Sequence, residues 1–182
     1  SFKVPKRENR WFTLLAEDLN AVGFQTAAFV SAQPMERRFG LAAGFDVTVH
    51  SRSARPVDEL VAAGATRAEG SAAVAAVSDV TITMLPDTAD VEQVLTGPGG
   101  VIEGTRAGSL VIDMSSIDPE PTRAMAAAFA ARDVAMLDAP VSGGEKGAID
   151  AALSIMVGGD VAAFDRARPV FEALGKNIVH VG

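Results

Sequence analysis

Short apolar runs recur along the chain from residue 45 onward, and alanine-rich stretches with helical periodicity separate them. The runs consist mainly of valine and isoleucine and do not alternate with polar residues, which is typical of strands that helices cover on both faces. This repeated order predicts an α/β fold, a doubly wound, Rossmann-like and mostly parallel sheet with helices on both faces. The expected strands are 45–50, 80–84, 109–113, 154–157 and 178–181.

Signals for the ends of helices lie between these runs. Pro56 and the acidic residues that follow it indicate the start of a helix, and Gly64 indicates its end. Asp118 stands before a Pro-Glu-Pro sequence and is expected to cap a helix that continues to about Arg132. These helices complete the repeated strand and helix units that a doubly wound sheet requires.

Composition narrows the classes of function. The chain has 182 residues, of which 48% are hydrophobic, enough for one main domain. A net charge of −7 argues against a nucleic-acid partner, because nucleic-acid binders present concentrated positive charge. Cysteine is absent and only two histidines occur, so disulfides are excluded and no metal site is expected.

No membrane association is expected either. The longest apolar runs fall short of the roughly 20 residues that a membrane-spanning helix needs, and the first residues do not have the order of a signal peptide. The sequence therefore predicts a cytoplasmic protein whose partners are small molecules.

The residues that follow two of the predicted strands are candidates for a binding site, because doubly wound sheets bind ligands at the carboxyl ends of their strands. Leu85 and Pro86 follow the run 80–84, and Ser115 and Ser116 follow the run 109–113. Backbone amides and hydroxyls there can bind a ribose or an amide, while proline stiffens the loop. The same residues also suit an ordinary helix start, so both interpretations stay open.

Arg52 and Ser53 follow the run that ends at His50. In dinucleotide-binding folds an acidic residue here binds the 2′-hydroxyl of the adenosine ribose, whereas an arginine suits a 2′-phosphate. Arg52 therefore favours NADP over NAD. A solvated arginine in a turn is the alternative, and we expect no chemistry from His50.

The segment 138–160 combines five glycines with a single proline. Its consecutive Gly143 and Gly144 can bring backbone N–H groups close to a carboxylate, and Ser142 can add a hydroxyl donor. Neither a nucleophile elbow nor a phosphate-binding P-loop is present. Lys146 is interpreted as a solvated charge.

Taken in order, these segments resemble the β-hydroxyacid dehydrogenase family, which includes 3-hydroxyisobutyrate dehydrogenase and, more distantly, 6-phosphogluconate dehydrogenase. Two of the matched segments are Val-Ile-Asp-Met-Ser-Ser at 111–116 and Asp-Ala-Pro-Val-Ser-Gly-Gly at 138–144. A single glycine-rich loop would be weak support, but the ordered set is specific. The remaining matched segments are 43–53, 84–86, 155–159 and 175–179.

The resemblance implies roles for these residues. Leu85 and Pro86 would border the cofactor, and Ser116 would lie near its nicotinamide. Ser142, Gly143 and Gly144 would hold the carboxylate of the substrate. The implied reaction is hydride transfer between NADP, or NAD, and a small 3-hydroxy acid or its semialdehyde. The family's catalytic lysine would lie beyond residue 182, so no catalytic residue is assigned to this chain.

Two features depart from the family pattern. Members open with a strand that runs into Gly-x-Gly-x-x-Gly, whose glycines admit the pyrophosphate. Here the corresponding region, residues 27–38, has no glycine, and the side chains of Ala32, Gln33 and Pro34 are expected to obstruct the phosphates. The family also continues into an all-helical domain, which is absent from these 182 residues.

We therefore expect residues 1–23 to form a poorly matched extension and residues 24–182 to form the NAD(P)-binding domain of a truncated β-hydroxyacid dehydrogenase. A catalytically inactive module that binds a dinucleotide or small acid is the alternative, and an imine reductase fragment is a minor one. The expected assembly is a homo-oligomer or a complex with a partner chain that supplies the missing helical domain, and such a partner chain would complete the enzyme.

Overall fold

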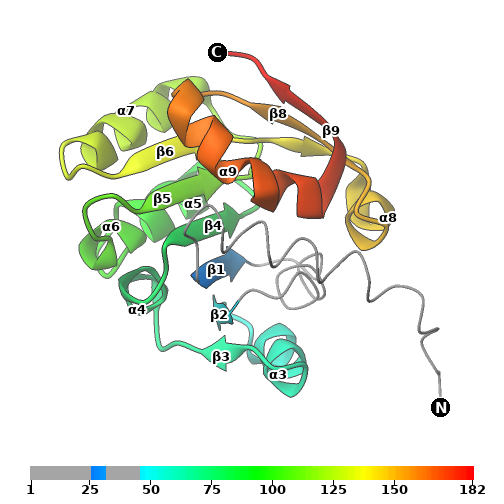
Figure 1. Ribbon diagram of the computed structural model, residues 1–182. Coiled ribbons are helices and arrows are strands. Elements are labelled where there is room, and N and C mark those ends of the chain that lie inside the picture. Colours follow the sequence, from blue (N-terminus) through cyan, green and yellow to red (C-terminus); the bar gives the residue numbers. More distant parts are fainter. Residues whose placement is uncertain (1–25, 32–45) are drawn as a thin grey trace.

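A six-stranded parallel sheet forms the centre of the molecule, with strand order β3-β2-β1-β4-β5-β6 (Figure 1). The computed structural model describes residues 26–31, as backbone, and residues 46–182. The strands are β1 (Thr26–Ser31), β2 (Asp46–His50), β3 (Thr66–Arg67), β4 (Val80–Met84), β5 (Leu110–Asp113) and β6 (Ala135–Asp138). The helices are α3 (Ala54–Ala62), α4 (Ser71–Ala76), α5 (Thr88–Leu95), α6 (Val101–Gly104), α7 (Pro119–Ala130), α8 (Gly144–Ile149) and α9 (Val161–Leu174).

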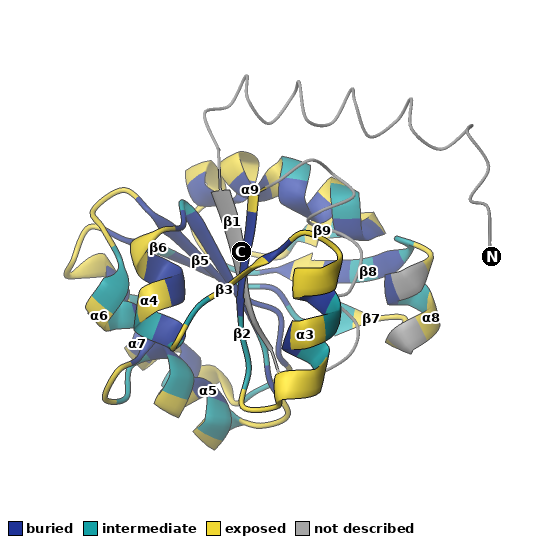
Figure 2. Ribbon diagram, turned by 90° about the horizontal axis from the view of Figure 1, so that it is seen from below, coloured by how far each residue is buried: buried dark blue, intermediate teal, exposed yellow. Residues whose placement is uncertain are grey.

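Helices cover both faces of this sheet, and each face has its own core (Figure 2). Side chains alternate along β5, so Leu110 and Ile112 pack with α3 and α9, whereas Val111 packs with α4, α5, α6 and α7. Phe129 is buried in the second of these cores. The continuous apolar runs are explained by this double coverage, and the predicted doubly wound, Rossmann-like fold is confirmed.

A second, three-stranded sheet of order β7-β8-β9 adjoins the first. It contains β7 (Val141–Ser142), β8 (Leu153–Val157) and β9 (Gly175–His180), and β7 pairs with β8 antiparallel while β8 and β9 are parallel. Asp138 at the end of β6 forms a bridge with Gly158, which links the two sheets. The mixed sheet and the helix α8 within 138–160 were not predicted from the sequence.

The helix that follows β5 differs from its prediction in two details. Asp118 occupies the N-cap position of α7, but its side chain makes no capping hydrogen bond; its backbone N–H instead donates to Thr88 Oγ1, at 3.2 Å. The helix ends at Ala130, two residues earlier than expected, and its first turn contains prolines as predicted. The predicted extension 1–23 and the glycine-poor region 32–38 lie outside the described residues.

Candidate functional site

The order of the strands reverses between β1 and β4, the point in the sheet from which the chain winds in both directions. In open α/β sheets ligands bind outside the carboxyl ends of the strands at such a point. Arg52 and Ser53 follow β2, Leu85 and Pro86 follow β4, and Ser116 follows β5, and these strands are neighbours of β1 or of one another. The fold therefore brings all five predicted cofactor residues to the carboxyl edge of the sheet.

Arg52 makes an ion pair across this edge. Its Nη2 donates to Asp90 Oδ2 at 2.9 Å, and the arginine side chain is 72% exposed, against 26% for the aspartate. Ser53 is the N-cap residue of α3 but makes no capping hydrogen bond with its side chain, which leaves the hydroxyl at the start of the helix. An exposed guanidinium and a hydroxyl at the end of β2 suit an anionic ligand.

The loops that follow β4 and β5 are tied together by hydrogen bonds. The backbone N–H of Leu85 donates to Ser115 Oγ at 2.9 Å. Asp118 of the second loop donates its N–H to Thr88 Oγ1 of the first at 3.2 Å. Asp87 Oδ1 caps α5 by accepting from the N–H of Asp90 at 2.8 Å. The two loops thus form a connected unit at the carboxyl edge of the sheet.

The predicted residues of these loops differ in exposure. The side chain of Leu85 is buried with the core residues of α5, so only its backbone faces the loop. Pro86 and Ser116 are exposed. Contacts of Leu85, Pro86 and Ser116 with a cofactor stay predictions, with Pro86 and Ser116 the better placed to make them through side chains.

A buried carboxylate, Asp113, lies at the base of this unit and was not among the residues predicted from the sequence. Its Oδ1 accepts from Thr83 Oγ1 at 2.8 Å and from Ser115 Oγ at 2.6 Å. Its Oδ2 is buried without a hydrogen-bond partner among the described residues. An acidic residue at the end of an otherwise apolar strand was the signal available in the sequence, because buried charge requires polar partners.

Burial raises the pKa of Asp113 above its ordinary value, and the hydrogen bonds from Ser115 and Thr83 oppose that rise. The pKa of Asp138, aligned with Asp113 on the neighbouring strand, is raised first by burial and then by repulsion from Asp113. These two carboxyls therefore bind more protons in the native state than in the unfolded chain, from the ordinary carboxyl pKa up to their raised pKa. Their contribution to stability is lost as the pH increases through that window.

We expect Asp113→Asn to reduce this loss of stability with increasing pH, because asparagine does not titrate. The pKa of Asp138 should also decrease in the variant, since the repulsion from Asp113 is removed. Urea unfolding at a series of pH values and carboxyl ¹³C NMR titration measure the two effects.

Thr83→Val is the matched variant, because losing its hydrogen bond should raise the pKa of Asp113 further. An unchanged Asp138 titration in Asp113→Asn would contradict the assignment.

The predicted substrate segment lies in the second sheet. Ser142 is exposed on β7, and Gly143 and Gly144 follow it with backbone φ angles of 138° and 60°. Residues that carry a side chain rarely adopt such positive φ angles. A Cβ at Gly143 would also lie 3.1 Å from Cδ2 of Leu153. The glycines are therefore needed for the turn into α8, and their contact with a substrate carboxylate stays a prediction.

Lys146 and His50 each contact a neighbouring group of the protein. Lys146 is exposed on α8 and forms an ion pair with Asp150, in agreement with its interpretation as a solvated charge. His50 ends β2, and its Nδ1 lies 3.2 Å from the carbonyl oxygen of Ala68.

Within residues 26–31 and 46–182, no group of three or more metal-ligating side chains is found, and no helix is long and apolar enough to cross a membrane.

Comparison with known proteins identifies a family. Residues 32–182 match the family model described as the NAD binding domain of 6-phosphogluconate dehydrogenase. The chain is 46% identical over 126 residues to 2-(hydroxymethyl)glutarate dehydrogenase of Eubacterium barkeri, covering 69% of this chain and 42% of that protein. It is 47% identical over 135 residues to 2-hydroxy-3-oxopropionate reductase of Escherichia coli, covering 74% and 46%.

A solved structure agrees with these sequence matches. The 3-hydroxyisobutyrate dehydrogenase of Mycobacterium tuberculosis, solved with L-serine, superimposes with a TM-score of 0.79 and 33% identity over 87% of this chain and 55% of that one. The chain spans less than half the length of the curated relatives it matches. The resemblance found in the sequence is thus confirmed, and the chain belongs to the NAD-binding domain family of 6-phosphogluconate dehydrogenase and the related β-hydroxyacid dehydrogenases.

Proposed function

We propose that the chain binds NADP, in preference to NAD, at the carboxyl ends of β2, β1, β4 and β5. The observation that carries this proposal is the exposed guanidinium of Arg52 at the end of β2, beside the reversal of strand order. In a dinucleotide-binding sheet this position faces the ribose of the adenosine, where a cation suits a 2′-phosphate. The described residues at the end of β2 therefore fit the 2′-phosphate of the cofactor that the family implies.

Further residues have proposed parts in the same site. Ser53 would donate to the 2′-phosphate, and Pro86 would border the cofactor between the ribose and the nicotinamide. Ser116, exposed after β5, would contact the nicotinamide end. The connection of the two loops through Ser115 would keep Pro86 and Ser116 at a fixed separation.

We further propose that the domain serves an oxidoreductase acting on a small 3-hydroxy acid or its semialdehyde. The relatives named for dehydrogenation of a hydroxymethyl acid and reduction of a hydroxy-oxo acid support this substrate class. Bound NADP would supply or accept the hydride. Ser142, Gly143 and Gly144 would hold the carboxylate of the acid through the serine hydroxyl and backbone N–H groups.

Fluorescence titration tests the binding proposal. The purified chain is titrated separately with NADPH and NADH while nicotinamide emission is followed, and circular dichroism establishes that the chain is folded. We expect saturable binding of both, with the lower Kd for NADPH. A folded chain that shows no saturable change with either nucleotide would overturn the proposal.

A further inference from the structure

We propose that Asp90 is a positioning residue that sets cofactor preference, because it holds Arg52 and so reduces selectivity for a dinucleotide that carries a 2′-phosphate. The inference deepens the proposed function and rests on it. It concerns a residue that follows a different strand from Arg52 and lies 38 positions away in the sequence.

The location of the pair is the first observation. Arg52 follows β2 and Asp90 lies in the first turn of α5, after β4. In the sheet β1 stands between β2 and β4, so these strands are two spacings apart, or about 10 Å. The 2.9 Å contact between Arg52 and Asp90 therefore spans the carboxyl edge at β1, where the ribose of a dinucleotide would lie.

The two partners differ in how firmly they are held. The backbone of Asp90 is fixed by the capping bond from its N–H to Asp87 Oδ1, at 2.8 Å, and its side chain is mostly covered. The side chain of Arg52 is 72% exposed. The carboxylate is consequently the fixed partner, and the guanidinium is the group that must reorient when a ligand binds.

The charges of Arg52 and Asp90 determine which of the two dinucleotides Asp90 disfavours. A phosphate is recognised best by two parallel bonds from the guanidinium fork, and the bond to Asp90 occupies one nitrogen of that fork. A 2′-phosphate beside Asp90 would also meet a like charge. A 2′-hydroxyl carries no charge and can donate a hydrogen bond to the carboxylate. Asp90 therefore disfavours the phosphorylated dinucleotide relative to the unphosphorylated one.

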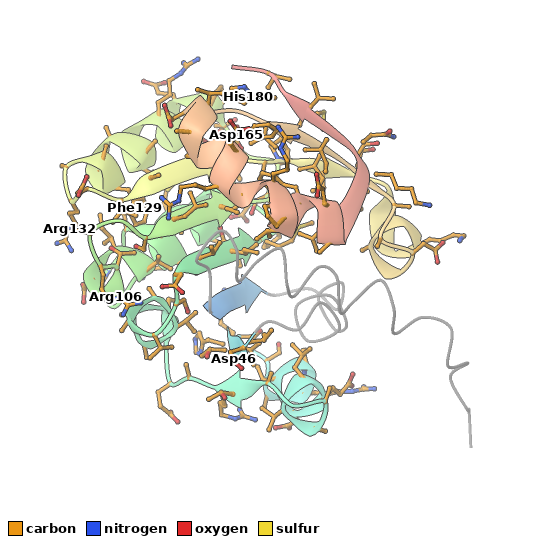
Figure 3. All side chains as sticks on the ribbon, viewed as in Figure 1. Asp46, Arg106, Phe129, Arg132, Asp165 and His180 are labelled. Carbon is orange, nitrogen blue, oxygen red and sulfur yellow. The ribbon has the colours of Figure 1, made fainter. Side chains whose placement is uncertain are left out.

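The experiment compares Kd values for NADPH and NADH in four forms of the full chain. Asp90→Asn should bind NADPH about fivefold more tightly, the gain expected from releasing one exposed ion pair, with NADH unchanged or weaker. Asp90→Glu keeps the carboxylate and should keep the preference of the unsubstituted chain. Asp165→Asn is the control: it removes the same charge from an ion pair with Arg168 on α9 (Figure 3) and should change neither Kd.

Two further readouts separate positioning from a structural effect. The gain in Asp90→Asn should largely disappear in an Arg52→Ala background, because Asp90 acts through Arg52. Added salt should weaken NADPH binding more steeply in Asp90→Asn, where the guanidinium faces the phosphate alone.

The outcomes distinguish this inference from the proposed function. If the unsubstituted chain binds neither nucleotide, the proposed function fails and this inference falls with it. If the chain binds NADPH but Asp90→Asn leaves the ratio of the two Kd values unchanged, only the role of Asp90 is overturned. If Asp165→Asn tightens NADPH binding as much as Asp90→Asn does, the effect comes from net charge, and the role of Asp90 is overturned as well.

Discussion

Replacing Arg52 with aspartate is expected to weaken NADPH binding about tenfold to a hundredfold, while NADH binding changes by less than about threefold. The larger loss follows because a hydrogen bond to a charged group contributes about 1.5–3 kcal/mol, which corresponds to that range of affinity. The new carboxylate would also repel the 2′-phosphate. NADH lacks this phosphate, so its affinity depends little on Arg52. Titration of both nucleotides measures the two changes.

Arg168→Asp provides the control for charge reversal. Arg168 lies on α9, is partly exposed and pairs with Asp165, at 3.1 Å, so its reversal changes the net charge of the chain equally without touching the carboxyl edge of the sheet. Both Kd values should stay within about twofold of the unsubstituted chain, as for a surface change remote from a site. Equal losses of NADPH and NADH binding in Arg52→Asp would contradict the assignment of the 2′-phosphate to Arg52.

Replacing Gly104 with alanine is expected to destabilise the fold by about 3 kcal/mol, near the upper end of the cost of overpacking. Gly104 ends α6 where that helix meets α4, and a Cβ there would lie only 1.9 Å from the carbonyl oxygen of Ala72. The obstructing atom belongs to the backbone, so the two helices must separate. Urea unfolding monitored by circular dichroism measures the change.

Further contacts resist that separation. Ala72 donates its N–H to the carbonyl oxygen of Gly99 at 3.1 Å, and Arg132 Nη1 donates to the carbonyl oxygen of Ile102 at 2.6 Å. Arg132 and Arg106 lie at the margin of the molecule beside α6 (Figure 3), whereas Phe129 is buried in the core. The segment before α6 and α6 itself are thus attached to neighbouring segments, which limits how far the two helices can separate.

Gly70→Ala is the matched control, because it makes the same chemical change at the start of α4, the helix that Gly104 contacts. Gly70 is the N-cap of α4, its backbone is extended, and a Cβ there would meet nothing within 4 Å. Its cost should stay at about 1 kcal/mol, the loss expected when alanine replaces a better N-cap residue. A Gly104→Ala variant no less stable than Gly70→Ala would contradict the steric argument.

Three strands of the six-stranded sheet, β2, β4 and β5, could be predicted because they are continuous apolar runs between two layers of helices. The run 80–84 corresponds to β4 without any change of boundary, and its residues Val80 and Ile82 lie in the core with α3 and α9. In the second sheet the runs 154–157 and 178–181 likewise predicted β8 and β9, but β7 and its antiparallel pairing with β8 were not predicted. β7 has only two residues, and the turn after it depends on positive φ angles at Gly143 and Gly144, so neither periodicity nor length indicated an antiparallel pairing.

The sequence predicted which loops form the candidate site, but not the contacts between their side chains. The rule that ligands bind at strand ends located Arg52, Pro86 and Ser116. It could not reveal that Arg52 pairs with Asp90, because the two residues meet only when the sheet has assembled. Nor did it indicate that Asp113 joins Thr83 to Ser115, since an acidic residue after an apolar run also suits a solvated strand end.

The central claim is that a dinucleotide binds at the carboxyl ends of β2, β1, β4 and β5. The most direct test is a ¹H–¹⁵N NMR titration of the full chain with NADPH, after assignment of the backbone amides. We predict saturable shifts concentrated at residues 50–53, 85–90 and 114–116, with α6 and the middle of α9 unaffected. Shifts concentrated elsewhere, or no shifts from a folded chain at saturating NADPH, would contradict the account.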